Sequence, residues 1–260
     1  MKRNKLGKTG IDVPAVGIGT WRTFDSDVSR RPLVKAALSA GANLFDSSPM
    51  YGRSESNLAQ SIRALRSEVL VATKVWSNDT ELGRKQIDAA IQMFGTVDIY
   101  QVHNLVQTDA YLPVLQGLVE DGKVRAVGAT HYQESAFDDL AAVMRSGRVD
   151  MIQIPYNPLR RSAERELLPL AESLGLGVLV MSPLQGGILD HRPSQSELSQ
   201  LGVDTWPQAI LKWIVSDSRV SCVLTATHLP ERVVENSKAG QLPYFNPAQR
   251  EFVERIAGRK

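Results

Sequence analysis

Short apolar segments alternate with longer amphipathic ones along almost the whole chain, and this alternation limits the folds open to it. The apolar segments are rich in β-branched residues and are bounded by turn residues, as buried parallel strands are. We expect eight strands, at Ala15–Gly19, Leu44–Phe45, Val69–Thr73, Val97–Val102, Val124–Gly128, Met151–Ile154, Gly177–Met181 and Val220–Leu224.

Between these segments lie eight others in which apolar residues recur with the period of an α-helix. Several of them end at a glycine, as at Gly41, Gly122 and Gly175, and glycine readily adopts the left-handed conformation that closes a helix. The pattern predicts amphipathic helices at Arg31–Ala40, Ser56–Leu65, Gly83–Phe94, Tyr111–Glu120, Ser135–Arg145, Glu164–Leu174, Pro207–Ser216 and Pro230–Lys238.

Eight strands alternating with eight helices predict an α/β fold, a (β/α)8 TIM barrel in which a parallel sheet closes on itself. An open doubly wound sheet is the alternative. Turn signals at Gly7, Gly10 and Pro14 come before the first strand, where we expect an N-terminal β-hairpin, and Asn246–Lys260 begins Asn-Pro-Ala, which predicts a C-terminal extra helix. Barrels of about 250 residues are often one domain, so we expect residues 1–260 to form a single domain.

The charges are nearly balanced, with 30 basic and 28 acidic residues and no long block of either sign. This pattern does not favour nucleic acid or a membrane surface as a partner. The basic start is not followed by an apolar stretch, and no apolar run approaches the ~20 residues that span a bilayer. A single cysteine, Cys222, excludes an internal disulfide and a cysteine-based zinc site. We expect a soluble cytoplasmic protein without a metal, a monomer or weak homo-oligomer, acting on a small molecule.

In barrels of this kind, the functional site lies at the carboxyl ends of the strands. Three neighbouring predicted strands end at titratable residues, which are Asp46, Lys74 and His103. Each has an ordinary structural explanation by itself, as a helix cap, a lysine at the barrel mouth or a buried structural histidine. Together they place an acid, a base and an imidazole at one end of the barrel, which indicates acid–base chemistry.

Tyr51 follows the second predicted strand and adds a proton donor to this group. A phenol with a pKa near ~10 is a poor acid at neutral pH unless a neighbouring cation stabilises the phenolate. Lys74 is the candidate cation, and a pairing with Asp46 would keep it charged and oriented. His103 would donate a hydrogen bond to a substrate carbonyl oxygen. The structural alternative for Tyr51 is a loop aromatic residue that covers the barrel mouth.

At these residues the sequence resembles the aldo-keto reductase superfamily, in its short-loop bacterial type. The resemblance implies a (β/α)8 barrel that binds NADPH across the strand ends and reduces aldehydes or ketones to alcohols, with tyrosine as the proton donor. It is carried by Phe45-Asp-Ser-Ser-Pro-Met-Tyr-Gly52, Thr73-Lys74 and Val102-His103-Asn104, and it continues through Gly17-Ile-Gly-Thr-Trp21, Gln153-Ile-Pro-Tyr-Asn157, Met181-Ser-Pro-Leu184 and Arg232-Val-Val-Glu-Asn236.

The resemblance also implies roles for individual residues. Asp46, Tyr51, Lys74 and His103 match the family's catalytic tetrad. The residues implied to bind the cofactor are Gly19, Thr20, Trp21, Asp46, Thr130, His131, Gln153 and Met181 near the nicotinamide, Ser182, Leu184 and Gly186 along the pyrophosphate, and Thr227, Arg232, Glu235 and Asn236 at the adenosine end. Those expected to bind substrate are Trp21, Met50, Tyr51, His103 and Tyr132, and Trp76 and Trp206 are further candidates to line an apolar pocket.

Three departures from the family's pattern concern the cofactor. Thr130-His131 stands where many members have Ser-Asn, so an imidazole offers the carboxamide a different set of hydrogen-bonding groups. Met181 stands where an aromatic ring often stacks on the nicotinamide. Ala226 stands where NADPH-specific members often have a lysine, which leaves Arg232 as the main cation for a 2′-phosphate. We expect NADPH as the cofactor, with NADH possible.

Two other functions stay open. In a barrel aldolase, Lys74 would form a Schiff base, but that chemistry needs a neutral lysine, and a nearby Asp46 favours the charged form. The other is a cofactor-sensing binding module like the channel-associated β subunits of the superfamily, which the complete tetrad and the lack of an amino-terminal extension disfavour. The loops over the substrate are short except for Gln185–Trp206, in which Gly186-Gly187 indicates a mobile flap.

Overall fold

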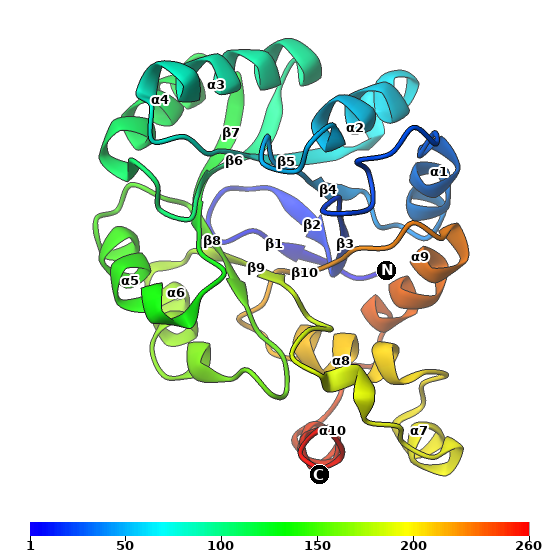
Figure 1. Cartoon of the computed structure of the whole chain (residues 1–260). Coiled ribbons are helices and arrows are strands. Elements are labelled where there is room, and N and C mark those ends of the chain that lie inside the picture. The colour runs from blue at the N-terminus through cyan, green and yellow to red at the C-terminus, as the bar shows by residue number, and fades with distance from the viewer. Residues whose placement is uncertain (260) are drawn as a thin grey trace.

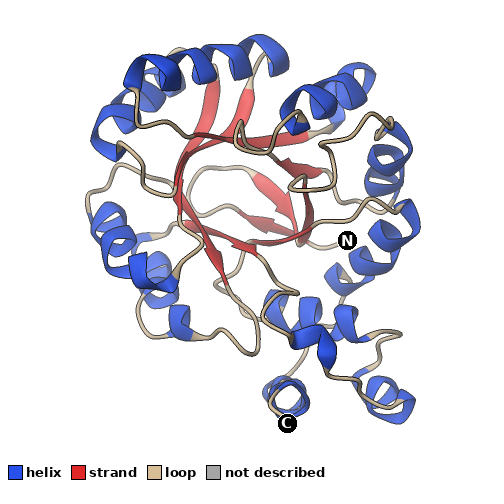
Figure 2. Ribbon diagram, in the orientation of Figure 1, coloured by secondary structure: helices blue, strands red, loops and turns tan. Residues whose placement is uncertain are grey.

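The protein folds as a closed barrel of eight parallel strands, seen in a computed structural model that describes residues 1–259 (Figure 1, Figure 2). This arrangement confirms the predicted (β/α)8 barrel, and the alternative of an open doubly wound sheet is wrong. In order around the barrel the strands are β3 (Val16–Gly19), β4 (Leu44–Asp46), β5 (Leu70–Val75), β6 (Val97–His103), β7 (Val124–Thr130), β8 (Met151–Pro155), β9 (Gly177–Met181) and β10 (Cys222–Thr225), and β10 pairs with β3 to close the ring.

Helices alternate with the strands and cover the outside of the barrel (Figure 2). Their amphipathic spacing turns an apolar stripe towards the strands, as Leu33, Val34 and Ala37 do in the first helix. The α-helices are α1 (Arg31–Ser39), α2 (Ser54–Ile62), α3 (Thr80–Phe94), α4 (Thr108–Glu120), α5 (Phe137–Arg145), α6 (Leu167–Leu174), α7 (Gln195–Leu201), α8 (Trp206–Val215), α9 (Pro230–Ser237) and α10 (Pro247–Ala257). Short 3-10 helices are η1 (Arg63–Glu68), η2 (Glu134–Ala136), η3 (Ser162–Glu164), η4 (Ile188–Asp190) and η5 (Lys238–Gly240).

Several strands run further at their carboxyl ends than the apolar pattern predicts, among them the three that carry titratable residues. β4 ends at Asp46, β6 ends at His103, and Lys74 is the second-last residue of β5. A strand ladder joins backbone groups, so a polar side chain does not end it, and Lys74 lies opposite Gln101 while His103 lies opposite Thr130. The candidate residues therefore stand on regular strands, which hold side chains more rigidly than loops do.

The barrel interior is closed at the amino end of the strands by a two-stranded hairpin. This hairpin, β1 (Arg3–Lys5) with β2 (Asp12–Pro14), confirms the predicted N-terminal element and lies behind the ring of strands in Figure 1. Its apolar side chains join one buried cluster with the inward-facing strand residues, which comprises Leu6, Ile11, Val13, Leu44, Ala72, Ile99, Ala126, Met151, Leu179, Cys222 and Leu224. Because this plug fills the amino end, the carboxyl ends of the strands form the accessible end of the barrel.

The segment expected to be a mobile flap, 185–206, contains two helical elements, η4 and α7. α7 begins with a capping box in which Ser194 and Glu197 satisfy each other's backbone N–H groups. Trp206 is buried and its indole N–H donates a 2.8 Å hydrogen bond to the Ile188 carbonyl, so its expected place in an open substrate pocket is wrong. The glycines remain outside regular structure, and Gly186 and Gly187 both have positive φ angles.

The predicted C-terminal extra helix is α10, which lies outside the ring next to α8 (Figure 1). Asn246 caps its start by accepting a 2.9 Å hydrogen bond from the Gln249 backbone. The indole N–H of Trp213 in α8 donates a 3.1 Å bond to Glu254, and Arg161 pairs with the same carboxylate. These contacts fix the helix to the outside of the barrel.

Candidate active site

Four of the predicted site residues gather at the carboxyl ends of β4, β5 and β6. Asp46, Lys74 and His103 are buried, with exposed fractions of 4%, 1% and 7%. The ring of Tyr51 packs edge-on against the His103 ring, with centroids 5.8 Å apart, and Lys74 Nζ lies 5.2 Å from the centre of the Tyr51 ring. The sequence placed these residues on neighbouring strands, and the fold brings them into one cluster.

Lys74 is fixed by three oxygen acceptors. Its ammonium donates to both carboxylate oxygens of Asp46, at 2.8 and 2.7 Å, and to the carbonyl oxygen of Ser47 at 2.8 Å. The amide of Gln101 donates a further 3.1 Å hydrogen bond to Asp46. Gln101 is a site residue that the sequence reasoning missed, although it lies two residues before His103 and therefore points to the same face of β6.

A hydroxyl group holds the imidazole of His103. Ser48 Oγ lies 3.0 Å from His103 Nδ1, and the same oxygen accepts a 3.2 Å hydrogen bond from the Met50 backbone N–H. The Ser48 hydroxyl can donate its proton to Nδ1, and in that arrangement the ring proton of a neutral His103 lies on Nε2. Ser48 was also missed, because a serine in a turn sequence gives no sign of its partner.

Burial and the charges of the cluster act in opposite directions on the pKa values of Lys74 and Tyr51. Burial lowers the pKa of Lys74, but the charges of Asp46 and Tyr51 and its hydrogen bonds outweigh burial and raise that pKa above its ordinary value. Burial raises the pKa of Tyr51, and the charge of Lys74 opposes this effect without cancelling it. Lys74 therefore acts on the phenol in the expected direction, but burial outweighs it and the net pKa of Tyr51 is raised. Lys74 is bound to Asp46, as expected.

His103 is neutral at physiological pH. Burial lowers its pKa to about 2, and the nearby charges of Lys74 and His131 act in the same direction. A neutral imidazole with a proton on Nε2 is a hydrogen-bond donor without being a strong acid.

A tight turn and a clamp of charged residues place Tyr51. The next residue, Gly52, has a φ of +61°, which strains other residues, and a Cβ atom there would lie 2.5 Å from the Asp25 carboxylate, which would have to shift. Arg53 binds Asp25 at 3.3 Å and Asp27 at 2.5 Å. These pairs attach the loop after β3 to the start of α2, two residues after Tyr51.

The residues expected around a nicotinamide lie at the ends of β3, β7 and β8, and one of them offers an unused donor. Gln153 is 1% exposed and its side-chain Nε2 has no hydrogen-bond partner among residues 1–259, while its backbone oxygen accepts a 2.8 Å bond from Thr130. His131 Nδ1 accepts from the Gln133 backbone, so a neutral ring carries its proton on Nε2. Burial lowers the pKa of His131, which favours this neutral form. Nε2 of Gln153 and Nε2–H of His131 are donors that suit a carboxamide oxygen.

The other residues expected around the nicotinamide and pyrophosphate border the same end. Gly19, Met181, Ser182 and Leu184 are half-buried, Thr20 is buried, and Ser182 has a left-handed backbone with φ of +53°. Gly186 lines a cavity of about 620 Å³ together with Gly187, Asp190, His191, Arg192, Ile256 and Arg259. Its lining carries charges of both signs, and Arg259 is paired with Glu197 at 2.6 Å.

The residues expected at the adenosine end lie just before α9 and along it. Arg232 is exposed and donates to both carboxylate oxygens of Glu235 at 3.2 Å, whereas Asn236 is 7% exposed. Thr227 Oγ1 accepts a 3.2 Å hydrogen bond from the Leu229 backbone. Arg232, the cation that the sequence offered for a 2′-phosphate, therefore already has a carboxylate partner.

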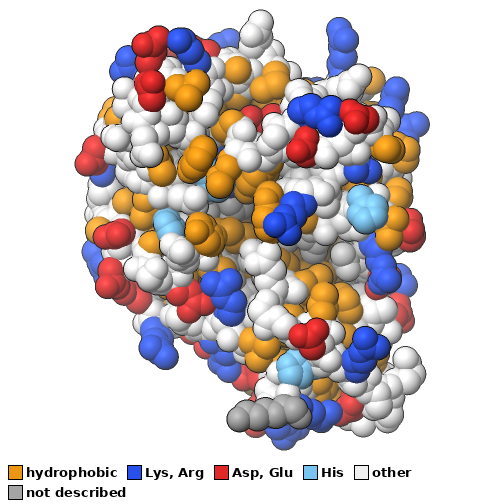
Figure 3. Space-filling view, viewed as in Figure 1, with side chains coloured by type: hydrophobic (Ala, Val, Ile, Leu, Met, Phe, Trp, Pro, Cys, Tyr) orange, Lys and Arg blue, Asp and Glu red, His pale blue; other side chains and the backbone are white. Residues whose placement is uncertain are grey.

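Apolar side chains are exposed around the tetrad. Trp21 (43% exposed), Met50 (47%), Trp76 (39%) and Tyr132 (52%) follow β3, β4, β5 and β7, and Tyr132 stacks on His131 with ring centroids 5.5 Å apart. Figure 3 shows hydrophobic side chains gathered around the centre of this face. Exposed large apolar side chains that cluster in one place indicate a binding surface.

Backbone strain is concentrated at the same end of the barrel. Among residues 1–259, the non-glycine residues with positive φ all lie in loops that follow β3, β6 and β9, and they are Arg22, Asn104, Leu105, Gln107 and Ser182. Such conformations cost of order 1–3 kcal/mol each and cluster at functional sites. Strain and exposed apolar surface therefore point to the end that holds the tetrad.

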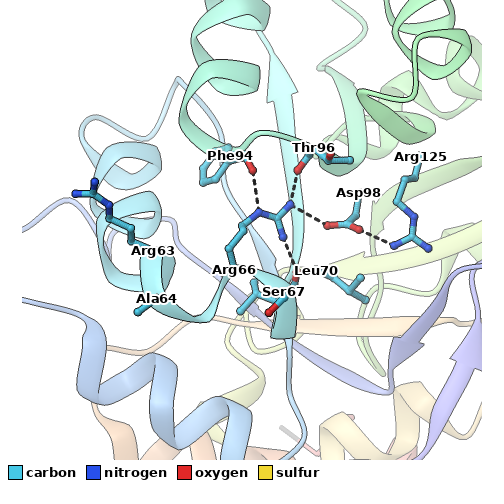
Figure 4. A pocket seen from close by; sticks show the side chains of 10 residues that line it. Arg63, Ala64, Arg66, Ser67, Leu70, Phe94, Thr96, Asp98 and Arg125 are labelled. Atoms are coloured by element: carbon cyan, nitrogen blue, oxygen red, sulfur yellow. Dashed lines mark hydrogen bonds and ion pairs between the residues drawn. The ribbon is translucent and has the colours of Figure 1, made fainter.

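A separate cavity of about 560 Å³ lies at the opposite end, near the starts of β5, β6 and β7 (Figure 4). Arg66 extends across it and donates to the carbonyl oxygens of Phe94 and Val69 at 2.9 and 2.7 Å, and Asp98 pairs with Arg125 at 2.7 Å. The guanidinium of Arg66 is bound to main-chain carbonyl groups. We therefore interpret the charged side chains of this cavity as structural and not as a binding site.

Residues 1–259 contain neither a membrane-spanning helix nor a metal-binding cluster. No helix there has the length and apolar character needed to cross a membrane, and no three His, Cys, Asp or Glu side chains are grouped so that they could hold a metal ion.

Comparison with known proteins places the chain among reductases of this fold. The NADH-specific methylglyoxal reductase of Escherichia coli is 29% identical over 92% of this chain and 93% of that protein. A putative voltage-gated potassium channel subunit beta of Schizosaccharomyces pombe is 30% identical over 90% of this chain and 86% of that protein. An aldo/keto reductase from Klebsiella pneumoniae, solved in complex with NADP and acetate, superposes with a TM-score of 0.83 at 21% identity, covering 100% of this chain and 98% of that one.

The family profile covers nearly the whole barrel. It matches residues 15–256, from the residue before β3 to the last turn of α10, and so includes the tetrad and the strand ends around it. The chain belongs to the aldo/keto reductase family.

Proposed function

We propose that the protein is an NAD(P)H-dependent oxidoreductase that reduces aldehydes or ketones to alcohols, with Tyr51 as the proton donor. The observation that supports this most directly is the contact of Tyr51 with both Lys74 and His103 at the open end of the barrel. A bound nicotinamide supplies the hydride that reaches the carbonyl carbon, and the side chains of this chain handle the proton.

Tyr51 donates its phenolic proton to the carbonyl oxygen as the carbon is reduced. The raised pKa of Tyr51 keeps the phenol protonated at neutral pH, so that the donor is present when the substrate arrives. The proton leaves a tyrosinate, which the ammonium of Lys74 stabilises in the water-poor cluster. Asp46 keeps Lys74 charged and oriented, and the tyrosinate regains a proton from solvent after the product leaves.

His103 orients and polarises the carbonyl. Its ring is neutral, with Ser48 on Nδ1, so Nε2–H is free to donate a hydrogen bond to the carbonyl oxygen beside the Tyr51 hydroxyl. Two donors at one oxygen fix the carbonyl and stabilise the charge that develops on it. The exposed apolar side chains of Trp21, Met50 and Tyr132 suit an apolar substituent on that carbonyl.

NADPH is the proposed cofactor, with NADH as a second possibility. Gln153, Thr130 and His131 suit the carboxamide of a nicotinamide. The choice between the two depends on Arg232, since Ala226 offers no charge and the ion pair with Glu235 competes with a 2′-phosphate. One relative is named as NADH-specific and one solved neighbour holds NADP.

Of the two rival functions, the aldolase fits the site less well. A Schiff-base aldolase needs a neutral lysine, and the pKa of Lys74 is raised above its ordinary value by a carboxylate 2.7 Å away. A cofactor-sensing role is favoured by the relatives named as potassium channel β subunits. Rapid steady-state turnover would contradict a role limited to sensing.

The proposed activity is tested by following NADPH and NADH oxidation across a panel of aldehydes, ketones and quinones, with dissociation constants for both cofactors from protein fluorescence. Turnover with at least one carbonyl compound supports the reductase. Tight cofactor binding with no turnover across the panel would favour the sensing role, and trapping of Lys74 by borohydride would favour the aldolase.

A further inference from the structure

Glu55 is a buried carboxylic acid that the proposed reaction does not use. It lies in the first turn of α2, four residues after Tyr51, and it is 8% exposed. The hydroxyl of Thr73 donates a buried hydrogen bond to Glu55 Oε1, and Thr73 immediately precedes Lys74 in β5. This one bond therefore joins the segment that carries Tyr51 to the strand that carries Lys74.

Thr73 and Lys74 are neighbours on β5, and their side chains face opposite sides of the barrel wall. Successive strand residues alternate, so Lys74 points into the barrel, where it binds Asp46, and Thr73 points outwards to α2. Tyr100 lies opposite Thr73 in the β5–β6 ladder, is fully buried, and its hydroxyl has no hydrogen-bond partner within residues 1–259. Glu55 is thus the acid beside two buried hydroxyl groups on the outer face of the strands that hold the tetrad.

A structural role alone does not account for an acid at this place. Glu55 forms no ion pair within the described part of the chain, and burial of a carboxyl group without a cation is unfavourable. An apolar side chain would fill the space between α2 and β5 at a smaller cost in stability. Local features that oppose stability occur mainly at functional sites.

We propose that Glu55 is a positioning residue of the reductase, and that its hydrogen bond with Thr73 sets the placement of Tyr51 relative to Lys74. The proposal rests on the proposed function, because it assigns Glu55 to the same proton transfer. Tyr51 is followed by the Gly52 turn and then by α2, so any movement of the first turn of α2 moves the phenol.

The surroundings of Glu55 also link the site to pH. Burial raises the pKa of Glu55 to about 7, against the opposing effects of the Thr73 hydrogen bond and the charge of Lys74. The titratable groups that face it are Lys74 on β5 and Tyr100 on β6, and Asp88 of α3 lies beyond Tyr100. As pH rises through about 7, a negative charge appears near Lys74 and opposes formation of the tyrosinate, so we expect carbonyl reduction to slow.

The experiment compares four variants of the full-length protein with the wild type. Thr73→Val removes the hydrogen-bond donor without a change of charge, Thr73→Ser keeps it, and Glu55→Gln keeps the acceptor but cannot ionise. Ser221→Ala is the matched control, since Ser221 is a buried residue whose hydroxyl donates to the Lys5 carbonyl at the other end of the barrel. The measured quantities are kcat and KM for one aldehyde across pH, the NADPH dissociation constant and the melting temperature.

We expect Thr73→Val to lower kcat roughly tenfold with an unchanged NADPH dissociation constant, because small displacements of a reacting group reduce rates steeply. Thr73→Ser should restore most of the rate, and Ser221→Ala should keep it. We expect Glu55→Gln to match the wild-type rate at about pH 6 and to lose the decline through about pH 7.

Two outcomes would overturn the proposal. One is a Thr73→Val variant with a lower melting temperature but a wild-type kcat, and the other is a Glu55→Gln variant with a wild-type pH profile. If the wild type reduces no carbonyl compound, the proposed function fails instead. The NMR signal of labelled Tyr51 separates these cases, because an unchanged signal in Thr73→Val contradicts the positioning role even without turnover.

Discussion

Asp46 and Lys74 form an ion pair that is almost completely removed from water. Such a pair adds little net stability, because desolvation of both charges opposes their attraction, but loss of one partner costs about 3–5 kcal/mol. Gln101 and the Ser47 carbonyl satisfy the remaining hydrogen-bonding groups of the pair. The arrangement therefore holds a charged lysine at a fixed place, which is what stabilisation of a tyrosinate requires.

Stability should depend on pH through Glu55. Its pKa is about 7 in the folded protein and 4.5 ordinarily, so the stability that the protonated acid contributes is fully present below pH 4.5 and is lost as pH rises through about 7. Glutamine mimics the protonated acid. We expect Glu55→Gln to be more stable than the wild type at about pH 8, by up to about 3 kcal/mol, and equally stable near pH 4.5.

Urea unfolding of both proteins at the two pH values measures this difference. A Glu55→Gln variant that is no more stable than the wild type at the higher pH would show that burial does not oppose ionisation of this acid.

The sequence predicted the tetrad because its members stand at strand ends or in a recognisable segment. Asp46, Lys74 and His103 close three apolar runs, and their common location follows once the strands are parallel. Gln101, Ser48 and Glu55 could not be assigned in the same way. Their roles depend on which side chain lies opposite each of them, and spacing along the chain does not fix that distance.

Among the elements, the loop from β4 to α2 does most to define the site. It carries Ser48 and Tyr51, and it is fixed by the Gly52 turn and by the pairs of Arg53 with Asp25 and Asp27. Loops usually place a side chain less precisely than strands do, and these contacts restrict this loop.

Gly52→Ala should damage this loop specifically. The new Cβ atom would lie 2.5 Å from Asp25 Oδ2, and alanine is strained at a φ of +61°. We expect kcat to fall at least about tenfold, with a loss of stability of about 1–3 kcal/mol and unchanged NADPH affinity. Gly95→Ala is the matched control, because Gly95 has a φ of +76° but open space around it. Equal losses of kcat in both variants would contradict a local effect on Tyr51.

Element boundaries and loop conformations are the parts of the fold that the sequence predicted least well. The order of the barrel strands and of the helices other than α7 was predicted correctly, because hydrophobic period and turn residues are local signals. α7 was missed, although Ser194-Gln-Ser-Glu197 has the pattern of a capping box that could have revealed it. Arg22 and Ser182 have positive φ angles although neither is glycine, and no local signal predicted this conformation.

At the scale of the whole molecule, barrel closure decides which residues meet. The pairing of β10 with β3 joins the first and last barrel strands, and the hairpin of β1 and β2 packs into the amino end. Each strand depends on neighbours that are distant in the sequence, so the barrel cannot lose one part without weakening the rest.

The expected single domain should therefore unfold in one step. We expect thermal and denaturant unfolding, followed by far-ultraviolet circular dichroism and by tryptophan fluorescence, to give coincident transitions. Trp213 reports on the outer helices and Trp21 on the open end of the barrel. Two separated transitions would indicate more than one independently folding unit.

The central claim is that Tyr51 gives the proton in carbonyl reduction, and Tyr51→Phe tests it most directly. We expect kcat for an aldehyde to fall by about 10²- to 10⁴-fold, with the NADPH dissociation constant nearly unchanged, because only the hydroxyl is removed. Tyr244→Phe, outside the site, should retain wild-type turnover. Turnover within a factor of a few of wild type in Tyr51→Phe would contradict the role of Tyr51 as the proton donor.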